Sequence, residues 1–246
     1  MLSAYMRGSP VNFHNIMNYA EIIDQTFLKK DSSEEELRMA CEEAKKYGFR
    51  GFCVFPKDAR LAKKLLEGSG VKVTTLIDEP TGASSHEERL RMAERAKKDG
   101  SEEIDVVMKI DDFKNGKCEE VSKDLEEICK ILPAKVIIGS GYLADEEIKK
   151  ASEMVKRAGA ICVKTATLGD PLDHSELREK AKHVKIMRES APGILVKAAG
   201  LIRSLNDLKM MLEAGADIIG TSSGVEIMKE VMGEEVEPEE EWRKVE

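Results

Sequence analysis

The sequence lacks several features that would assign it to particular classes of protein. The cysteines show no CxxC spacing and no even framework; they are Cys41, Cys53, Cys118, Cys129 and Cys162. We interpret them as reduced thiols of a cytosolic protein. No apolar stretch approaches the roughly 18 to 20 residues of a membrane span, and the N-terminus lacks the apolar region of a signal peptide. We therefore expect a soluble, cytoplasmic protein with no role in a membrane.

An excess of positive charge is also missing. The chain has 47 acidic and 39 basic residues, and the resulting net charge of -8 argues against a general role in nucleic-acid binding. The four histidines are scattered, without an HExxH motif or a paired ligand spacing. We therefore predict no metal site and no cofactor. The expected partner is a small molecule.

The residues that are present alternate regularly between strand and helix patterns. Hydrophobic residues make up 41% of the 246 residues and charged residues 35%, which is enough for one large core with a charged surface. The predicted strands are 21–24, 50–55, 71–77, 103–108, 135–139, 160–165, 194–198 and 217–221. Eight such units in a chain of this length favour a single-domain α/β fold, a closed TIM (β/α)8 barrel. An open doubly wound sheet is disfavoured because the turn at 25–29 is not glycine-rich.

The segments between the strands read as amphipathic helices. The first has an apolar face at Leu37, Ala40, Cys41 and Ala44. Glycines recur where helices should end, at Gly48, Gly100, Gly159 and Gly215. We divide the chain into an N-terminal extension or extra helix at 1–19, the barrel at 20–232 and an acidic tail at 233–246.

Two lysines stand at the ends of short apolar runs, Lys164 on the sixth predicted strand and Lys197 on the seventh. An ammonium near a protein interior is costly unless it is paired or loses its proton. If both side chains point into the barrel, they are neighbours about 5 Å apart. Their repulsion would lower the pKa of one of them and make that amine a nucleophile for a carbonyl.

Other polar residues close the predicted strands, where the active site of a βα barrel forms. Asp24 closes the first strand, Cys53 lies near the end of the second and Asp105 sits in the fourth. An inward carboxylate such as Asp105 could hold water and move protons. In the alternative interpretation, the lysines and aspartates form a structural ion network, and Cys53 is only a small core residue.

Six segments in order resemble the signatures of the 2-deoxyribose-5-phosphate aldolases. They are IDQTFLK at 23–29, GFCVFP at 51–56, EIDVV at 103–107, VKTAT at 163–167, VKAAG at 196–200 and GTSS at 220–223. The resemblance implies a metal-independent class I aldolase of nucleotide catabolism on a TIM barrel. Such a lyase reversibly cleaves 2-deoxy-D-ribose 5-phosphate to D-glyceraldehyde 3-phosphate and acetaldehyde. We also expect a homo-oligomer.

The resemblance also implies roles for individual residues. Lys164 would form the Schiff base, Lys197 would be the neighbouring charge that activates it, and Asp105 with Asp24 would relay protons. The residues implied to bind the substrate are Cys53, Thr26, Thr167, Gly200, Arg203, Gly220, Ser222 and Ser223. Ser222 and Ser223 fit a helix N-cap equally well.

The chain departs from the family pattern in loops that should hold the substrate phosphate. Leu168 and Leu201 occupy positions where the family has glycine, and Asp78 and Glu79 add negative charge near the expected mouth. A leucine adds bulk and restricts φ where backbone N–H groups should face a phosphate. Two alternatives therefore stay open. One is a related class I aldolase for a different or unphosphorylated aldehyde, and the other is a non-catalytic, metabolite-binding barrel.

Overall fold

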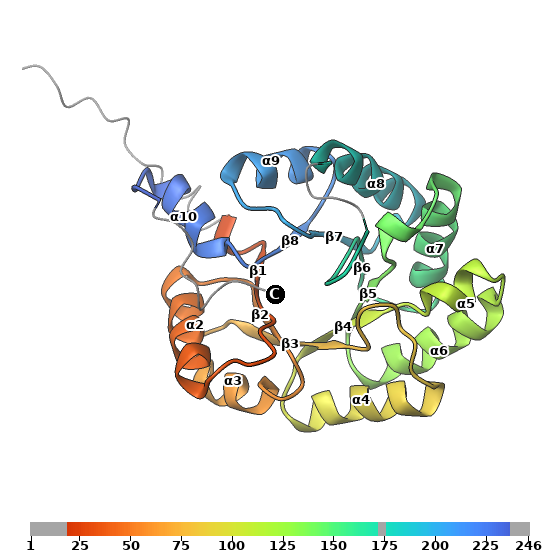
Figure 1. Ribbon diagram of the computed structural model, residues 1–246, viewed down its shortest axis with the longest axis horizontal. Helices are drawn as coiled ribbons and strands as arrows, with labels where there is room; N and C mark the ends of the chain where they lie inside the picture. The colour runs from red at the N-terminus through yellow and green to blue at the C-terminus, as the bar shows by residue number, and fades with distance from the viewer. Residues whose placement is uncertain (1–18, 172–175, 237–246) are drawn as a thin grey trace, which may run out of the picture.

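The computed structural model describes residues 19–171 and 176–236, in which eight parallel strands close into a barrel in sequence order. The strands are β1 (Ile23–Phe27), β2 (Gly51–Val54), β3 (Lys72–Ile77), β4 (Glu103–Val107), β5 (Ala134–Ile137), β6 (Cys162–Lys164), β7 (Leu195–Ala199) and β8 (Ile218–Thr221). Strand β8 pairs back with β1, and helices surround the ring of strands (Figure 1). The predicted TIM (β/α)8 barrel is confirmed.

The strand ends differ from the sequence prediction in two places that matter for function. Strand β1 runs to Phe27, beyond the predicted end at Asp24, and β7 runs to Ala199, one residue beyond its predicted end at 198. Asp24 and Lys197 therefore lie within their strands and do not close them. Lys164, by contrast, is the last residue of β6.

Helices connect the strands, and several of them begin at a serine cap. They are α2 (Glu34–Tyr47), α3 (Ala59–Leu65), α4 (His86–Lys98), α5 (Ile110–Lys114), α6 (Cys118–Ile131), α7 (Asp145–Arg157), α8 (Leu177–Ser190), α9 (Leu205–Glu213) and α10 (Gly224–Met232), with a 3-10 turn at Ser140–Tyr142. Ser33 and Glu36 form a capping box that starts α2, and Gly48 ends it at φ +68°. The predicted apolar face of α2 is buried.

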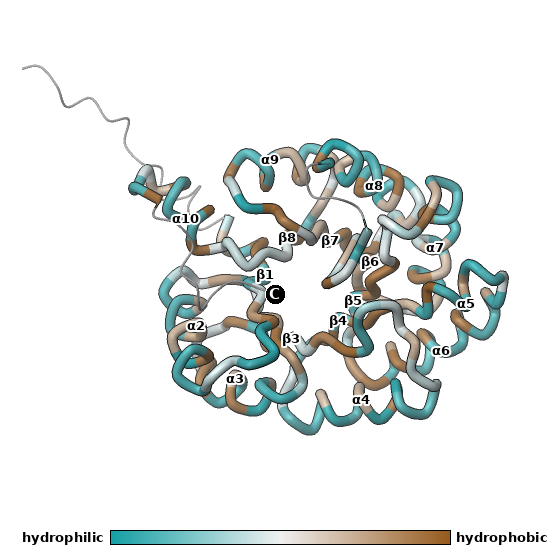
Figure 2. The backbone as a smooth tube through the Cα atoms, in the orientation of Figure 1, coloured by the Kyte–Doolittle hydropathy of each residue, from teal (hydrophilic) through white to brown (hydrophobic). Residues whose placement is uncertain are grey.

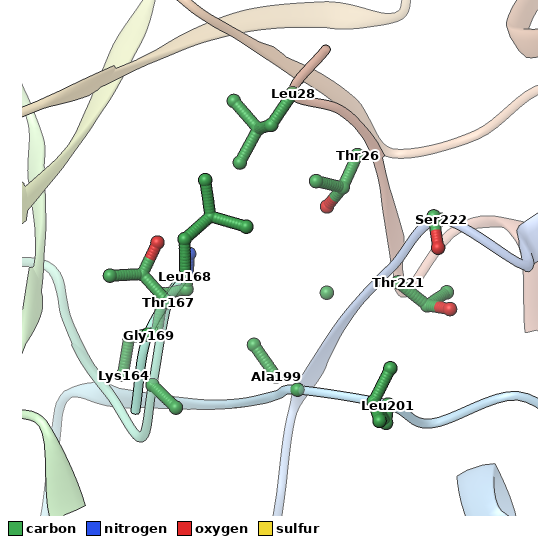
Figure 3. A pocket seen from close by; sticks show the side chains of 13 residues that line it. Thr26, Leu28, Lys164, Thr167, Leu168, Gly169, Ala199, Leu201, Thr221 and Ser222 are labelled. Carbon is green, nitrogen blue, oxygen red and sulfur yellow. The ribbon is translucent and has the colours of Figure 1, made fainter. Parts of the chain in front are cut away.

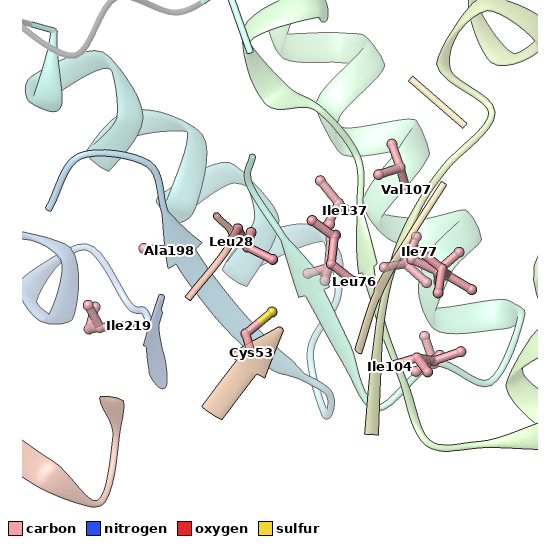
Figure 4. Packing of buried hydrophobic residues seen from close by; sticks show 14 of the residues in the cluster. Leu28, Cys53, Leu76, Ile77, Ile104, Val107, Ile137, Ala198 and Ile219 are labelled. Carbon is pink, nitrogen blue, oxygen red and sulfur yellow. The ribbon is translucent and has the colours of Figure 1, made fainter. Parts of the chain in front are cut away.

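The core lies between the strands and the inner faces of the helices. Many strand residues are hydrophobic, and the outward helix faces are largely hydrophilic (Figure 2). Leu76, Ile104 and Ile137 belong to one buried hydrophobic cluster (Figure 4), and none of the three is exposed. Burial on both faces is what keeps an all-parallel sheet stable.

Two of the predicted segments, the N-terminal extension at 1–19 and the acidic tail at 233–246, lie at the ends of the chain. Residues 1–18 and 237–246 lie outside the described residues, and so does most of the predicted extension and of the acidic tail. Residues 233–236 follow α10 without forming a helix or strand. Within the described part of the chain, every helix is too short or too polar to cross a membrane.

Candidate active site

Lys164 and Lys197 are register partners on the adjacent strands β6 and β7. Both side chains point into the barrel, because both ammonium groups reach Asp105 on β4, which is adjacent to neither strand. The sequence prediction that the two lysines are neighbours inside the barrel is confirmed. Their surroundings therefore decide what each amine can do.

The Asp105 carboxylate lies between the lysines. Its Oδ2 accepts hydrogen bonds from Lys164 Nζ at 2.6 Å and from Lys197 Nζ at 2.9 Å. Lys135 Nζ lies 3.1 Å from Oδ1. Burial by itself would raise the pKa of Asp105, but the three lysines outweigh burial and hold that pKa well below its usual range. Asp105 is therefore an anion in contact with the amine of Lys164.

Lys197 is sealed between two carboxylates. Its Nζ donates to Asp24 Oδ2 at 2.7 Å as well as to Asp105, and its side chain is fully buried. Burial alone would lower the pKa of Lys197, but Asp105 and Asp24 raise it above its ordinary value. Lys197 thus stays a cation. Asp24 stays an anion, because Lys197, Lys135 and Arg50 overcome the effect of burial and lower its pKa.

The ion network continues toward the other end of the barrel through residues that sequence reasoning missed. Lys135 Nζ donates to Glu103 Oε2 at 2.6 Å and to Thr74 Oγ1 at 3.1 Å. Arg50 joins Asp24 to Glu103, with N–O distances of 2.7 and 2.9 Å. Burial would raise the pKa of Glu103, yet Lys135 and Arg50 lower it to about 2. Strand parity was the available signal for Glu103, which lies two residues before Asp105; the register of Lys135 with Asp105 is visible only in the structure.

Two glycines leave the space that these charged groups fill. A Cβ atom on Gly51 would lie 2.5 Å from Asp24 Oδ1, and one on Gly220 would lie 2.8 Å from Lys197 Cε. Any side chain at either position would displace Asp24 or Lys197. Gly220 was predicted only as a substrate-binding residue. In the structure it also makes room for Lys197.

A cavity of about 260 Å³ opens at the carboxyl ends of the strands, and Lys164 forms part of its floor (Figure 3). Five residues predicted to bind the substrate line it: Thr26, Thr167, Gly200, Gly220 and Ser222. Among the lysines that contact Asp105, only Lys164 lines this cavity. Lys164 is thus the one amine of this group that a carbonyl compound bound in the cavity could reach.

Comparison with known proteins identifies the family of this chain. No protein-family model matches the sequence. The deoxyribose-phosphate aldolase of Caldanaerobacter subterraneus is 40% identical over 223 residues, which cover 88% of this chain and 94% of that protein. The one from Staphylococcus haemolyticus is 40% identical, over 87% of this chain and 96% of that protein. The chain belongs to the deoxyribose-phosphate aldolase family. It is a carbon–carbon lyase of that type.

Solved structures of similar proteins have the same fold as this aldolase. An aldolase called QR15 has a TM-score of 0.81 and 36% identity, over 87% of this chain and 96% of its own. The deoxyribose phosphate aldolase of Aeropyrum pernix, described as having a unique tetrameric structure, has a TM-score of 0.79 and 31% identity. That match covers 88% of this chain and 92% of the Aeropyrum protein.

Three residues predicted to bind the substrate of the aldolase do not line its cavity. Cys53 is buried, and its Sγ lies 3.9 Å from Asp105 Oδ2; burial, together with Asp105, raises the pKa of its thiol to about 11. Arg203 is exposed. Ser223 is buried at the N-cap of α10, where its backbone N–H donates to Thr221 Oγ1. The aldolase cavity, as far as the described residues form it, therefore has no arginine in its lining.

The lining of the aldolase cavity includes residues that sequence reasoning did not assign to it. Leu28, Ala166, Gly169, Ala199 and Thr221 join Leu168 and Leu201, the two leucines that depart from the family pattern. Leu201 adopts φ +47°, a conformation that non-glycine residues rarely adopt. All of these residues lie at the carboxyl end of β1, β6, β7 or β8 or in the loop that follows, and that position was the signal that could have found them.

One group of side chains in the described part of the aldolase could hold a metal ion. Asp145 on α7 and Glu179 with His183 on α8 bring their ligand atoms within 4.8 Å of one another. The Lys182 ammonium already lies between the two carboxylates, 2.8 Å from Asp145 and 2.9 Å from Glu179. None of these residues lines the aldolase cavity, and Lys182 already neutralises part of their charge.

Proposed function

We propose that this aldolase reversibly cleaves 2-deoxy-D-ribose 5-phosphate to D-glyceraldehyde 3-phosphate and acetaldehyde through a Schiff base on Lys164. One observation carries the proposal: Lys164 contacts the Asp105 carboxylate and at the same time lines the cavity. Lys197 and Lys135 contact the same carboxylate but do not line the cavity. Their positions therefore favour Lys164 over Lys197 and Lys135 as the nucleophile.

The reaction that we propose starts with attack of the neutral Lys164 amine on the aldehyde carbon C1 of the open-chain sugar. Loss of water then gives an iminium ion. The iminium accepts the electron pair of the C2–C3 bond as that bond breaks, while a base removes the proton of the C3 hydroxyl. D-Glyceraldehyde 3-phosphate leaves, the enamine takes a proton at C2, and water hydrolyses the imine to release acetaldehyde.

The charged neighbours of Lys164 support the proton transfers in this proposal. Asp105 lies in direct contact with the Lys164 amine and can accept its proton before attack. Lys197 donates to both Asp105 and Asp24, so it can return protons along the same hydrogen-bonded chain. We assign Lys197, Asp105 and Asp24 to this relay. Thr26, Thr167 and Ser222 supply hydroxyl groups to the substrate.

Borohydride trapping tests the proposed Schiff base directly. Incubation with acetaldehyde and borohydride should leave an N-ethyl group on Lys164, which peptide mass spectrometry can locate. Lys164→Met should abolish the adduct, while Lys185→Met, at an exposed position on α8, should leave it unchanged. An adduct on another lysine, or no adduct, would contradict the mechanism.

The cavity lining favours a second candidate, a class I aldolase for an unphosphorylated aldehyde. Leu28, Leu168 and Leu201 line the cavity, and Lys164 is its only cationic side chain among the described residues. Comparing kcat/KM for 2-deoxyribose with and without the 5-phosphate decides between the candidates. We expect the phosphorylated sugar to be preferred; equal values would favour the second candidate.

We also propose the wider setting of this activity. The acidic chain has a small-molecule cavity, and we expect it to act in the cytoplasm on a phosphorylated sugar or aldehyde. A homo-oligomer is expected, and the tetramer described for the Aeropyrum pernix relative supports it. The proposed domain division keeps residues 20–232 as one barrel. Sedimentation of the purified protein would measure the oligomeric state.

A further inference from the structure

Lys180 on α8 is a buried cation outside the ion network of the barrel. Only 2% of the residue is exposed, and the negative charge of Asp170 offsets only part of the effect of that burial on the ammonium. Its Nζ donates to two backbone carbonyls, those of Ala199 at 3.0 Å and Gly200 at 2.5 Å. Burial lowers the pKa of Lys180 to about 8. A lysine kept here at such a cost needs a function.

The two carbonyls belong to the loop that forms one wall of the cavity. Ala199, Gly200 and Leu201 all line that cavity. The peptide bonds among them are trans, since the one cis bond in the described residues precedes Pro80. In a trans peptide the C=O and the following N–H point in opposite directions. Because the Gly200 carbonyl points to Lys180, the N–H of Leu201 points away from Lys180.

The same loop holds Leu201 in a strained conformation. Gly200, the first residue after β7, has φ +98°, and Leu201 follows it with φ +47°. A left-handed leucine costs roughly 1–2 kcal/mol and persists only where its surroundings impose it. Within 19–171 and 176–236, the Leu201 N–H donates to no other residue. Consecutive left-handed residues with N–H groups directed to one side form a concave site for an anion or oxyanion.

We propose that Lys180 is a positioning residue that holds the 199–201 loop from behind, so that the Leu201 N–H faces the substrate. This inference rests on the proposed function, because it takes the phosphorylated end of the substrate to lie against this loop. Lys180 does not line the cavity and touches no reacting atom. Its effect is exerted through the carbonyls that it binds.

The test compares Lys180→Met with Lys185→Met, which changes an exposed lysine of the same helix. Methionine keeps the length of the side chain and removes the ammonium. In Lys180→Met, KM for 2-deoxyribose 5-phosphate should rise about tenfold, as the loss of a charge-assisted hydrogen bond implies, with kcat changed less than about twofold. Borohydride trapping of acetaldehyde on Lys164 should be unchanged. Lys185→Met should change none of these values.

Leu201→Gly supplies a second, coupled test. Glycine adopts a left-handed φ without cost, so a loop with glycine in place of Leu201 should no longer depend on Lys180. The increase in KM caused by Lys180→Met should shrink at least about threefold in the Leu201→Gly background, as expected for residues that act on one loop. Equal effects in both backgrounds would overturn the proposal.

Hydrogen exchange keeps the inference testable without turnover. Amides of the 199–203 peptide should exchange at least about tenfold faster in Lys180→Met than in the wild type. In the variant the loop can open without first breaking the hydrogen bonds from Lys180. Unchanged exchange would overturn the anchoring role. Faster exchange with an unchanged KM would overturn the positioning of substrate. Failure of wild-type trapping at Lys164 would instead refute the proposed function, and the exchange result would still decide the role of Lys180.

Discussion

Inside the barrel, charged side chains lie in direct contact with one another. Asp24, Asp105 and Glu103 face Lys135, Lys197 and Arg50 at N–O distances between 2.6 and 3.7 Å. The mouth of the cavity is lined instead by leucines, hydroxyl groups and glycines, with Lys164 as its one charged side chain among the described residues. Lys164 belongs to both regions.

The two regions differ because they are built from different parts of the chain. The interior charges stand on or directly before strands, where register fixes each neighbour, and every cation there has a carboxylate partner before any substrate arrives. The mouth is formed by the loops after the strands, and it carries little charge of its own. We infer that the interior determines the chemistry and that the mouth determines which aldehyde reaches it.

Removing the residue that joins the two regions should have the largest effect. Lys164→Arg keeps a positive charge beside Asp105 but supplies no neutral amine, because arginine stays protonated. We expect cleavage of 2-deoxyribose 5-phosphate to fall roughly 10⁴-fold or more, as for loss of other covalent nucleophiles. Initial rates of acetaldehyde release measure this. Lys185→Arg serves as the matched control, and appreciable cleavage by Lys164→Arg would show that another amine is the nucleophile.

A change within the interior should affect stability as well as rate. Asp105→Asn removes the anion between Lys135, Lys164 and Lys197, leaving buried cations with fewer partners. Breaking a buried ion pair in this way costs about 3–5 kcal/mol of unfolding free energy. Urea denaturation followed by circular dichroism measures it. The exposed Asp31→Asn should cost much less; a similar loss in both variants would mean that the network is not a stabilising unit.

Acid should weaken the interior before it affects the mouth. Asp24, Asp105 and Glu103 have pKa values below their usual range in the fold, while in the unfolded chain they protonate near pH 4. The unfolded state therefore binds more protons as pH falls below about 4, and the free energy of unfolding decreases toward about pH 2. Urea titrations across this range test the slope. Asp105→Asn should flatten it, and an unchanged slope would contradict the assignment.

Changes confined to the mouth should have the smallest effect on stability. Leu168 is partly buried and packs at the edge of the core. We expect Leu168→Ala to cost less than about 2 kcal/mol, at the low end for leucine truncation. The ratio of kcat/KM between phosphorylated and unphosphorylated deoxyribose should change about tenfold, as expected for lost contacts in a pocket. If Leu168→Ala changed the rate of borohydride trapping at Lys164 but left this ratio unchanged, the inference that the mouth selects the aldehyde would be contradicted.

The interior was largely predictable from the sequence because strand parity carries over directly into space. The lysine pair and Asp105 followed from alternation along three strands. Lys135 and Arg50 did not, because both stand at the beginnings of apolar runs, where a lysine or arginine usually reaches solvent. Their burial depends on Glu103 and Asp24, which are distant in the chain.

The mouth was less predictable because loop conformation depends on contacts between distant segments. Arg203 follows the same loop as Leu201 but is exposed, and its backbone N–H donates to the Asp207 carboxylate near the start of α9. Lys180 contacts the loop from a helix that precedes it in the chain. No periodicity in the sequence indicates either contact.

Gly51 and Gly220 limit how this chain can vary during evolution. Because each glycine occupies space against one charged side chain, Asp24 or Lys197, a mutation at either glycine is tolerated only after the charge opposite has changed. Loss of that charge would in turn leave its ion partners buried and unpaired. The glycine and the charged residue of each pair can therefore be replaced only together, whereas the loops at the mouth can acquire substitutions one at a time. Specificity can drift in this lineage while the interior remains fixed.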